Sequence, residues 1–285
     1  MSPTPRINGS TRLLGVIGWP VRHSRSPQMH AAAIEAAGLD LAYVPMEVAP
    51  ERLADAIAGL RALGFLGCNV TIPHKVGVAQ LADELTPAAR AIGAANTLTF
   101  RPDSSIEGHN TDAEGAFEAL EGDLPGFSAK GATVLVLGAG GTARGVAWGA
   151  AARGAARVLI LNRTVATAQA LAAEMQGLWP GREFRALHEA SQVSQLDQLD
   201  VVLQATSLGM KPADALPIDP AMLPATAAVL EAVYSPLETP FLAACRARGM
   251  RCVDGLSMLV AQGALSFERW TGIRPDRAAM RRAIT

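Results

Sequence analysis

The sequence Thr133-Val134-Leu135-Val136-Leu137 runs directly into Gly138-Ala139-Gly140-Gly141-Thr142-Ala143-Arg144-Gly145. The first segment is a compact apolar run of strand length, and the second matches the pattern G-x-G-x-x-A with Ala143 at its third, close-packing position. A helical stretch follows to about residue 153. This order of strand, glycine turn and helix predicts a dinucleotide-binding unit of the Rossmann type rather than a tight turn without a ligand. The residues expected to hold the cofactor at this turn are Gly138, Gly140, Gly141, Thr142 and Ala143.

The end of the next predicted strand, residues 158–161, indicates which dinucleotide binds. NAD sites usually place an acidic side chain there to accept a hydrogen bond from the ribose 2′-hydroxyl. This chain instead has Asn162, Arg163 and Thr164. A carboxylate would repel a 2′-phosphate, whereas a guanidinium binds phosphate or stacks on the adenine. The segment therefore favours NADP.

Alternating strands and helices fill the rest of the chain. Such alternation predicts an α/β protein with mainly parallel sheets and helices on both faces, and 285 residues suffice for two domains. A strand over residues 200–207 has a polar end that includes Thr206, residues 209–224 are predicted to form a surface loop, and residues 94–112 a hairpin. Further strands are expected at 13–18, 43–48, 63–68, 228–233 and 251–253, and helices at 26–38, 50–60, 78–85, 87–92, 239–248 and 256–270.

The stretch Asn69-Val70-Thr71-Ile72-Pro73-His74-Lys75 is the candidate for the chemistry. It offers an amide, a hydroxyl and an amine on a short turn, and Pro73 restricts its own backbone and that of Ile72. Polar side chains on a stiff turn at the end of a strand suit a small polar substrate. The alternative is that the amide and hydroxyl only satisfy backbone groups and that the amine is solvated.

A candidate anion site lies at Ser24-Arg25-Ser26-Pro27. Ser26 followed by Pro27 predicts a helix start with a capping hydroxyl, and Gly38 is a plausible stop for that helix. Ser24 and Ser26 would then lie beside unpaired N–H groups at the positive end of a helix, which is a natural carboxylate or phosphate site. Capping alone would explain Ser26 but not Ser24.

The composition excludes several classes of partner. The net charge is −1, so nothing indicates nucleic acid or an anionic membrane. No apolar run reaches the roughly 20 residues of a membrane helix, and residues 1–12 lack the apolar core of a signal peptide. Cys68, Cys245 and Cys252 lack metal-ligand spacing and favour buried free thiols in a reducing cytosol. We therefore expect a cytoplasmic protein without a bound metal that acts on a small molecule. A monomer or a homodimer is expected, and the sequence leaves the choice between them open.

Seven motifs in order resemble the shikimate dehydrogenase family over nearly the whole chain. They are Ser24-x-Ser26-Pro27, Asn69-Val70-Thr71-x-Pro73-x-Lys75, Gly93-x-x-Asn96-Thr97, Asn110-Thr111-Asp112, the glycine turn, Asn162-Arg163-Thr164 and Leu259-Val260-Ala261-Gln262. The resemblance implies NADPH-dependent, reversible reduction of 3-dehydroshikimate to shikimate in chorismate and aromatic amino-acid biosynthesis. It also implies a substrate domain of residues 1–112 completed by residues 255–285, and a Rossmann domain of residues 113–254.

The same resemblance assigns roles to the candidate residues. Lys75 and Asp112 flank the reacting hydroxyl, and an ammonium at that oxygen stabilises negative charge and delivers the proton. Asp112 would hold the amine and favour its charged form. The residues implied for the substrate are Ser24 and Ser26 at its carboxylate and Asn69, Thr71, Asn96 and Gln262 at its hydroxyls. From the residues alone, an amide such as Gln262 inside an apolar helix is more simply structural.

Three departures from the family pattern are visible. Many members have asparagine after a motif histidine, whereas here Ala31 follows His30. Gln204 stands where many members have asparagine, and residues 165–167 lack the second basic residue of NADP-specific members. The first two are expected to matter little, and the third predicts a modest preference for NADP. The alternatives are a quinate/shikimate dehydrogenase that uses NAD and, from another class, a catalytically inactive shikimate-binding regulator.

Overall fold

The computed structural model describes residues 7–285, so the first six residues of the segment examined for a signal peptide lie outside the described residues. The chain forms two compact units: residues up to Thr111 together with Val260–Thr285, and Asp112–Leu259. The second junction lies five residues beyond the expected residue 255. The reason is that Gly255 starts a continuous helix, α9 (Gly255–Thr271), whose first five residues group with the second unit.

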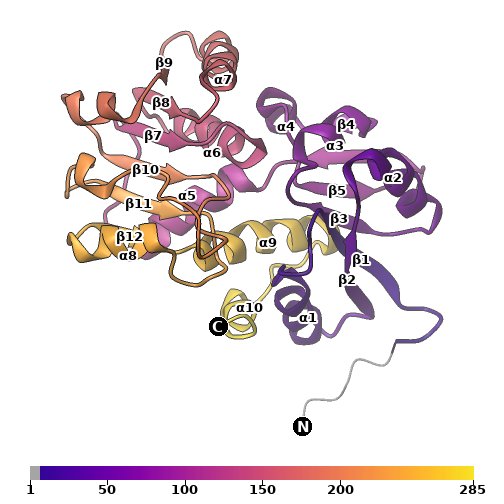
Figure 1. The fold of residues 1–285 in the computed structure, drawn as a ribbon. Helices are drawn as coiled ribbons and strands as arrows, with labels where there is room; N and C mark the ends of the chain where they lie inside the picture. Colours follow the sequence, from indigo (N-terminus) through magenta and orange to yellow (C-terminus); the bar gives the residue numbers. More distant parts are fainter. Residues whose placement is uncertain (1–6) are drawn as a thin grey trace. The chain divides into compact units, whose positions relative to one another are not determined.

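The unit Asp112–Leu259 contains one sheet with helices along the chain between its strands (Figure 1). Its strands are β7 (Thr133–Leu137), β8 (Arg157–Leu161), β9 (Glu183–Leu187), β10 (Val201–Gln204), β11 (Ala228–Glu231) and β12 (Arg251–Val253). Its helices are α5 (Asp112–Asp123), α6 (Gly141–Ala152), α7 (Val165–Leu178) and α8 (Pro240–Ala247), with short 3-10 turns η2 (Ala190–Gln195) and η3 (Pro220–Met222).

Every strand pair in this sheet is parallel, and the order is β12-β11-β10-β7-β8-β9. The chain leaves β7 toward β8 and β9, then returns to the other side of β7 with β10. This is the doubly wound order of a Rossmann unit, with its switch point between β7 and β10. The predicted fold class is confirmed, although α5, α7, β9, η2 and η3 have no counterpart among the strands and helices expected from the sequence.

Strand β7 is buried on both faces, which explains its unbroken apolar sequence. Val134 and Val136 contribute to one core cluster, and Leu135 and Leu137 contribute to another on the opposite face. Because successive side chains of a strand point to opposite faces, both faces must be covered by helices or loops. Leu135 is fully buried, and burying a leucine side chain stabilises a fold by roughly 1.5–3 kcal/mol.

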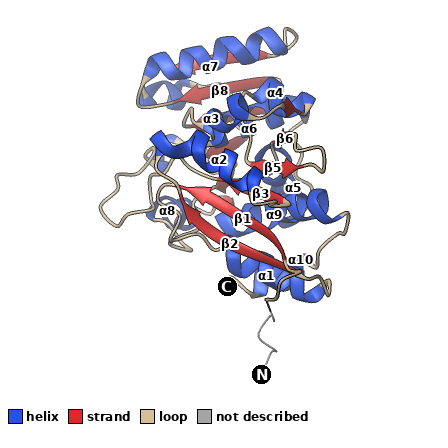
Figure 2. Cartoon of the chain, turned by 90° about the vertical axis from the view of Figure 1, so that its right-hand side faces the viewer, coloured by secondary structure: helices blue, strands red, loops and turns tan. Residues whose placement is uncertain are grey.

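The other unit also contains a six-stranded sheet, in the order β2-β1-β3-β5-β6-β4. Its strands are β1 (Arg12–Gly18), β2 (Leu41–Glu47), β3 (Gly67–Val70), β4 (Glu84–Leu85), β5 (Thr97–Phe100) and β6 (Ile106–His109). Its helices are α1 (Ser26–Ala36), α2 (Leu53–Ala62), α3 (Lys75–Leu81), α4 (Pro87–Ile92), the larger part of α9, and α10 (Arg277–Arg282), with a 3-10 turn η1 at Pro50–Arg52. Figure 2 shows β1 beside β2, and α1 beside α10.

The sheet of this unit is mixed rather than wholly parallel. Strand β5 runs antiparallel to β6, as the predicted hairpin required. It also runs antiparallel to β3, and the remaining pairs are parallel. Helix α1 ends as expected: Gly38 adopts a left-handed φ of 63°, and the N–H of Leu39 donates to the carbonyl of Ile34.

Local predictions failed at three places in the two units. The helix expected at residues 78–85 spans Lys75–Leu81, and Glu84–Leu85 form strand β4 instead. The strand expected at residues 63–68 begins only at Gly67, because Leu63 closes helix α2 and is 73% exposed while Gly64 turns the chain at a φ of 71°. The strand therefore includes Asn69. The predicted surface loop at residues 209–224 is only partly a surface segment, because Ile218 and Leu223 enter a core cluster while their neighbours Asp219 and Pro224 are exposed.

Cys68 and Cys245 are buried free thiols as predicted, and Cys252 is a partly exposed one. Burial raises the pKa of both Cys68 and Cys245 to about 12. In residues 7–285, no helix is long and apolar enough to cross a membrane.

Candidate active site

The glycine turn is built as its sequence predicts. Gly138 has a φ of 111°, and a Cβ there would lie 3.1 Å from the carbonyl oxygen of Ala205, so only glycine fits. Ala143 belongs to α6 and is fully buried in the core. Gly140 precedes α6 with no atom within 4 Å of the position of a Cβ, so its backbone is open to a close approach. The first N–H groups of this 12-residue helix suit a pyrophosphate.

The end of β8 presents a cation. Arg163 is exposed and, among the described residues, takes part in no ion pair. The Asn162 amide nitrogen donates to the carbonyl of Thr164 at 3.0 Å, which ties down the backbone on both sides of Arg163. The Arg163 guanidinium is a permanently charged, forked donor on a restrained turn, which suits a 2′-phosphate.

Thr206 lies beside the glycine turn at the switch point of the Rossmann sheet. It follows β10, which pairs with β7, and its methyl carbon lies 3.1 Å from the position of a Cβ on Gly138. Ligands of open α/β sheets bind outside the carboxyl ends of the strands at such a point. The predicted cofactor residues of this unit thus gather at the carboxyl ends of β7, β8 and β10.

A second switch point lies in the other unit, between β1 and β3. The chain passes from β1 to β2 on one side and returns with β3 on the other. The carboxyl ends of β1 and β3 are fastened together, because the N–H of Thr71 donates to Ile17 and the N–H of Trp19 donates to Ile72, both at 2.9 Å. The rule that places ligands at switch points therefore points to the turn of residues 71–75.

The turn of residues 71–75 is anchored by a buried histidine. The N–H of His74 donates to the carbonyl of Thr71 at 3.0 Å, and its ring Nε2 lies 2.8 Å from the carbonyl oxygen of Val48. The Ile72–Pro73 peptide bond is cis. Lys75 is the first residue of α3, and its carbonyl accepts from the N–H of Ala95 at 2.8 Å. Asp112 is the buried first residue of α5, in the other unit.

The predicted role of Ser26 as a helix cap was wrong. Helix α1 is capped at Arg25 without a side-chain hydrogen bond, because Ser26 already belongs to the helix. The local contact comes from Ser24, whose Oγ accepts from the N–H of Ser26 at 3.3 Å. Ser24 is partly exposed and Ser26 is buried, so Ser24 is the more accessible of the two hydroxyls.

A buried polar network joins β3, β5 and α9. Asn69 accepts from the Tyr43 hydroxyl at 2.8 Å, and its amide nitrogen lies 3.0 Å from Ser266 Oγ. Asn96 accepts from the N–H of Thr111 at 2.8 Å and donates to Gln262 at 3.3 Å. The network comprises Tyr43, Asn69, Asn96, Thr97, Thr111, Gln262 and Ser266.

The structure therefore brings Asn69, Asn96 and Gln262 into one connected group. Their predicted role at the substrate hydroxyls stays a prediction. Tyr43 and Ser266 were missed by the sequence reasoning. Ser266 lies four residues after Gln262, on the same face of a helix, so its spacing was the available signal. Nothing in the local sequence of Tyr43 pointed to Asn69, because their contact follows from the pairing of β1 with both β2 and β3.

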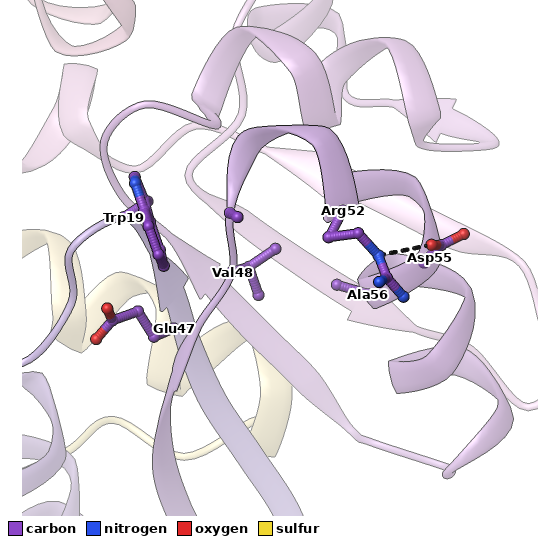
Figure 3. A pocket seen from close by; sticks show the side chains of 7 residues that line it. Trp19, Glu47, Val48, Arg52, Asp55 and Ala56 are labelled. Atoms are coloured by element: carbon purple, nitrogen blue, oxygen red, sulfur yellow. Dashed lines mark hydrogen bonds and ion pairs between the residues drawn. The ribbon is translucent and has the colours of Figure 1, made fainter.

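An open pocket of about 420 Å³ lies at the carboxyl ends of β1 and β2 (Figure 3). It contains no predicted site residue, and its lining consists of Trp19, Glu47, Val48, Ala49, Arg52, Asp55 and Ala56. Arg52 turns to pair with Asp55 at 2.9 Å (Figure 3). This exposed pair contributes little to stability.

A Rossmann unit with an intact glycine turn, joined to an α/β unit with a polar cluster at its own switch point, defines a two-domain, dinucleotide-dependent oxidoreductase. Three family models match the chain: the shikimate dehydrogenase substrate binding domain at residues 16–98, shikimate / quinate 5-dehydrogenase at 122–211, and the shikimate 5′-dehydrogenase C-terminal domain at 255–285. The shikimate dehydrogenase (NADP(+)) of Geobacter metallireducens is 45% identical, over 98% of this chain and 97% of that protein. The chain belongs to the shikimate dehydrogenase family.

Solved structures agree with this assignment. Shikimate 5-dehydrogenase from Thermus thermophilus, solved with NADP(H) and shikimate, is 35% identical with a TM-score of 0.84, over 96% of this chain and 98% of that one. Quinate dehydrogenase from Corynebacterium glutamicum, solved with NAD, is 32% identical with a TM-score of 0.85 and the same coverage. The fold is therefore shared by members with different cofactors.

Proposed function

We propose that this protein is an NADP-dependent shikimate dehydrogenase that reversibly reduces 3-dehydroshikimate to shikimate in aromatic amino-acid biosynthesis. The observation that carries the proposal is a combination within one chain. An intact glycine turn with Arg163 at the next strand end occurs together with the Lys75 turn, in a chain that matches NADP-dependent shikimate dehydrogenases along their whole length.

The glycine turn, the start of α6 and the segment of residues 162–164 would hold the dinucleotide. Bound NADPH supplies the hydride. Arg163 would bind the 2′-phosphate, because no carboxylate stands at this strand end to receive a 2′-hydroxyl. Thr206 would contact the cofactor from the neighbouring strand.

Lys75 would act as the acid and base at the substrate oxygen. Its position at the start of a helix, after a turn fastened to β1, restricts where the ammonium can reach. As an ammonium it stabilises the charge that builds on oxygen and delivers a proton, and as an amine it removes that proton in the reverse direction. Asp112 would favour the ammonium form as a nearby opposite charge.

The substrate would be oriented by groups of the same unit. Ser24 and Ser26 are proposed to hold its carboxylate, and Thr71 with the amides Asn69, Asn96 and Gln262 to hold its hydroxyls. Within the network, the amide oxygen and nitrogen of Asn69 already have protein partners, so its contribution is a fixed orientation that the substrate meets preformed.

Quinate oxidation with NAD is the second candidate. Residues 165–167 are Val-Ala-Thr, so Arg163 has no cationic neighbour on the following turn. A single cation discriminates less strongly against NAD than two would.

The deciding experiment follows reduced-cofactor absorbance with shikimate and quinate, each with NADP and NAD. The proposal expects the highest catalytic efficiency with shikimate and NADP. A preference for quinate and NAD would select the second candidate, and tight shikimate binding without turnover would indicate a shikimate-binding regulator. We also propose a cytoplasmic location. We propose a monomeric or homodimeric state, and light scattering in solution would test that state.

A further inference from the structure

Glu231, the last residue of β11, is a buried carboxyl group that the proposed chemistry does not use. It is 0% exposed, and no lysine, arginine or histidine in residues 7–285 pairs with it. Burial raises its pKa to about 7. A buried carboxyl group without a cation costs stability, so its place in the core calls for a compensating role.

The carboxyl group is held by three donors. The N–H of Val233 lies 2.9 Å from Oε1, the Thr239 hydroxyl lies 2.8 Å from Oε2, and the amide nitrogen of Gln204 lies 3.1 Å from Oε1. Thr239 also caps α8 by accepting from the N–H of Leu242 at 3.1 Å. Glu231 thus ties together the start of α8, the end of its own strand and the neighbouring strand β10.

Gln204 connects Glu231 to the loop of residues 205–210. It is fully buried opposite Glu231 in the paired strands. Its amide oxygen accepts from the N–H of Thr206 at 2.6 Å, and its amide nitrogen also donates to the carbonyl of Leu208 at 3.0 Å. Gln204 stands where many family members have asparagine, a departure that was expected to matter little. Its longer side chain connects β11 to this loop.

The loop held by Gln204 packs against the glycine turn. The carbonyl oxygen of Ala205 and the methyl of Thr206 both lie 3.1 Å from the position of a Cβ on Gly138. At its far side, Gly209 adopts a φ of 99°, and a Cβ on it would lie 3.2 Å from Thr239. The loop is therefore fixed between the turn that receives the pyrophosphate and the residue that binds Glu231.

We propose that Glu231 is a positioning residue for the cofactor site: through Gln204 it holds the loop of residues 205–210 as a preformed wall beside the glycine turn. The inference rests on the proposed function, because it needs a dinucleotide at that turn. Without the carboxyl group, the Gln204 amide loses a fixed acceptor, and Thr206 is free to leave the glycine turn. Binding of the dinucleotide must then order the loop, which weakens affinity.

The test measures NADP+ and shikimate dissociation constants by calorimetry, and thermal unfolding, for a set of variants. Glu231→Leu removes all three acceptor contacts, and Glu231→Gln keeps the oxygen that receives Val233 and Gln204. Gln204→Met keeps the length of the side chain but removes its hydrogen bonds to the loop. This variant tests the proposal if Glu231→Leu does not fold. Val229→Ala is the matched control, because Val229 is buried in the same strand but its side chain belongs to a core cluster.

We expect Glu231→Leu and Gln204→Met to weaken NADP+ binding about tenfold, as loss of one or two net hydrogen bonds implies, without changing shikimate affinity. Glu231→Gln should retain most of the wild-type affinity for NADP+. Val229→Ala should lower the unfolding temperature without weakening NADP+ binding. Normal NADP+ affinity in Glu231→Leu and Gln204→Met, or an equal loss in Val229→Ala, would overturn the role of Glu231. A wild-type chain that binds no NADP+ would overturn the proposed function as well.

Discussion

The Tyr43 hydroxyl donates to the amide oxygen of Asn69 across 2.8 Å, and both side chains are buried. Tyr43 belongs to β2 and Asn69 to β3, which lie on opposite sides of β1. The bond orients the Asn69 amide, because once its oxygen faces Tyr43 its nitrogen must face the carbonyl of Asn96 and the Ser266 hydroxyl. A residue outside every sequence motif thus orients one inside them.

Tyr43→Phe should lower the free energy of unfolding by roughly 1–3 kcal/mol, because it leaves the Asn69 oxygen buried without a donor. It should also weaken shikimate binding several-fold, since the amide is no longer held in one orientation. Denaturant unfolding and calorimetry measure both effects. NADP+ affinity is the internal control, and an unchanged shikimate affinity would show that Asn69 does not depend on Tyr43.

Lys75→Ala should reduce turnover by roughly 10²–10⁴-fold, the usual worth of a positioned proton transfer, with a much smaller effect on shikimate affinity. Initial rates at saturating shikimate and NADP measure the loss. Lys130→Ala, at an exposed lysine of the other unit, is the control and should retain full activity. Near-normal turnover of Lys75→Ala would remove Lys75 from the mechanism.

Ser24→Ala and Ser26→Ala should both raise the Michaelis constant for shikimate, because each removes a donor to the carboxylate. Neither should cost the roughly 1 kcal/mol of a lost helix cap, since α1 has no side-chain cap. Asp276→Ala is the contrast: Asp276 caps α10 by accepting from the N–H of Ala279 at 3.0 Å, so its loss should lower stability and leave the Michaelis constant unchanged. A normal Michaelis constant in Ser24→Ala would place the carboxylate elsewhere.

Arg163→Ala should weaken NADP binding about tenfold and leave NAD binding nearly unchanged, because NAD lacks the 2′-phosphate. This is the low end of what one charge-assisted contact provides, as expected without a second cation nearby. The ratio of catalytic efficiencies with the two cofactors, measured at two salt concentrations, reports the change. Arg251→Ala, at an exposed arginine on β12, is the control. Equal losses for both cofactors would indicate adenine stacking instead.

Acid should destabilise the fold through His30. Burial lowers its pKa from 6.5 to about 3, and the nearby Asn69 amide offsets only part of that shift. Neither ring nitrogen has a hydrogen-bond partner among the described residues. The unfolded chain therefore binds a proton below pH 6.5 that the folded chain excludes, so stability falls as the pH drops.

His30→Phe should remove this dependence while keeping the stack on Tyr43, whose ring lies 4.3 Å away and nearly parallel. Between about pH 6.5 and about pH 5 the wild type should lose about 2 kcal/mol more than the variant. Unfolding at both pH values measures the difference. Parallel pH dependences in the two proteins would show that His30 is not the responsible group.

Local sequence predicted much of the fold because its signals need no distant partner. The run Val134 to Leu137 is apolar on both faces, and Gly138 occupies a backbone conformation that other residues rarely adopt. The failures arose where tertiary packing overrides a local pattern. Leu63 is apolar but exposed at a helix end, and Ile218 lies in a loop-like sequence but is buried.

For the candidate site, the residue types and their order could be predicted from short segments whose chemistry is local: the glycine turn, Arg163 at a strand end, and the Lys75 turn. The contacts of Tyr43 with Asn69 and of Glu231 with Gln204 could not be predicted in this way, because they form only when the chain is folded. These pairs join neighbouring or flanking strands far apart along the chain, and which strands pair depends on burial of the whole sheet rather than on any one segment.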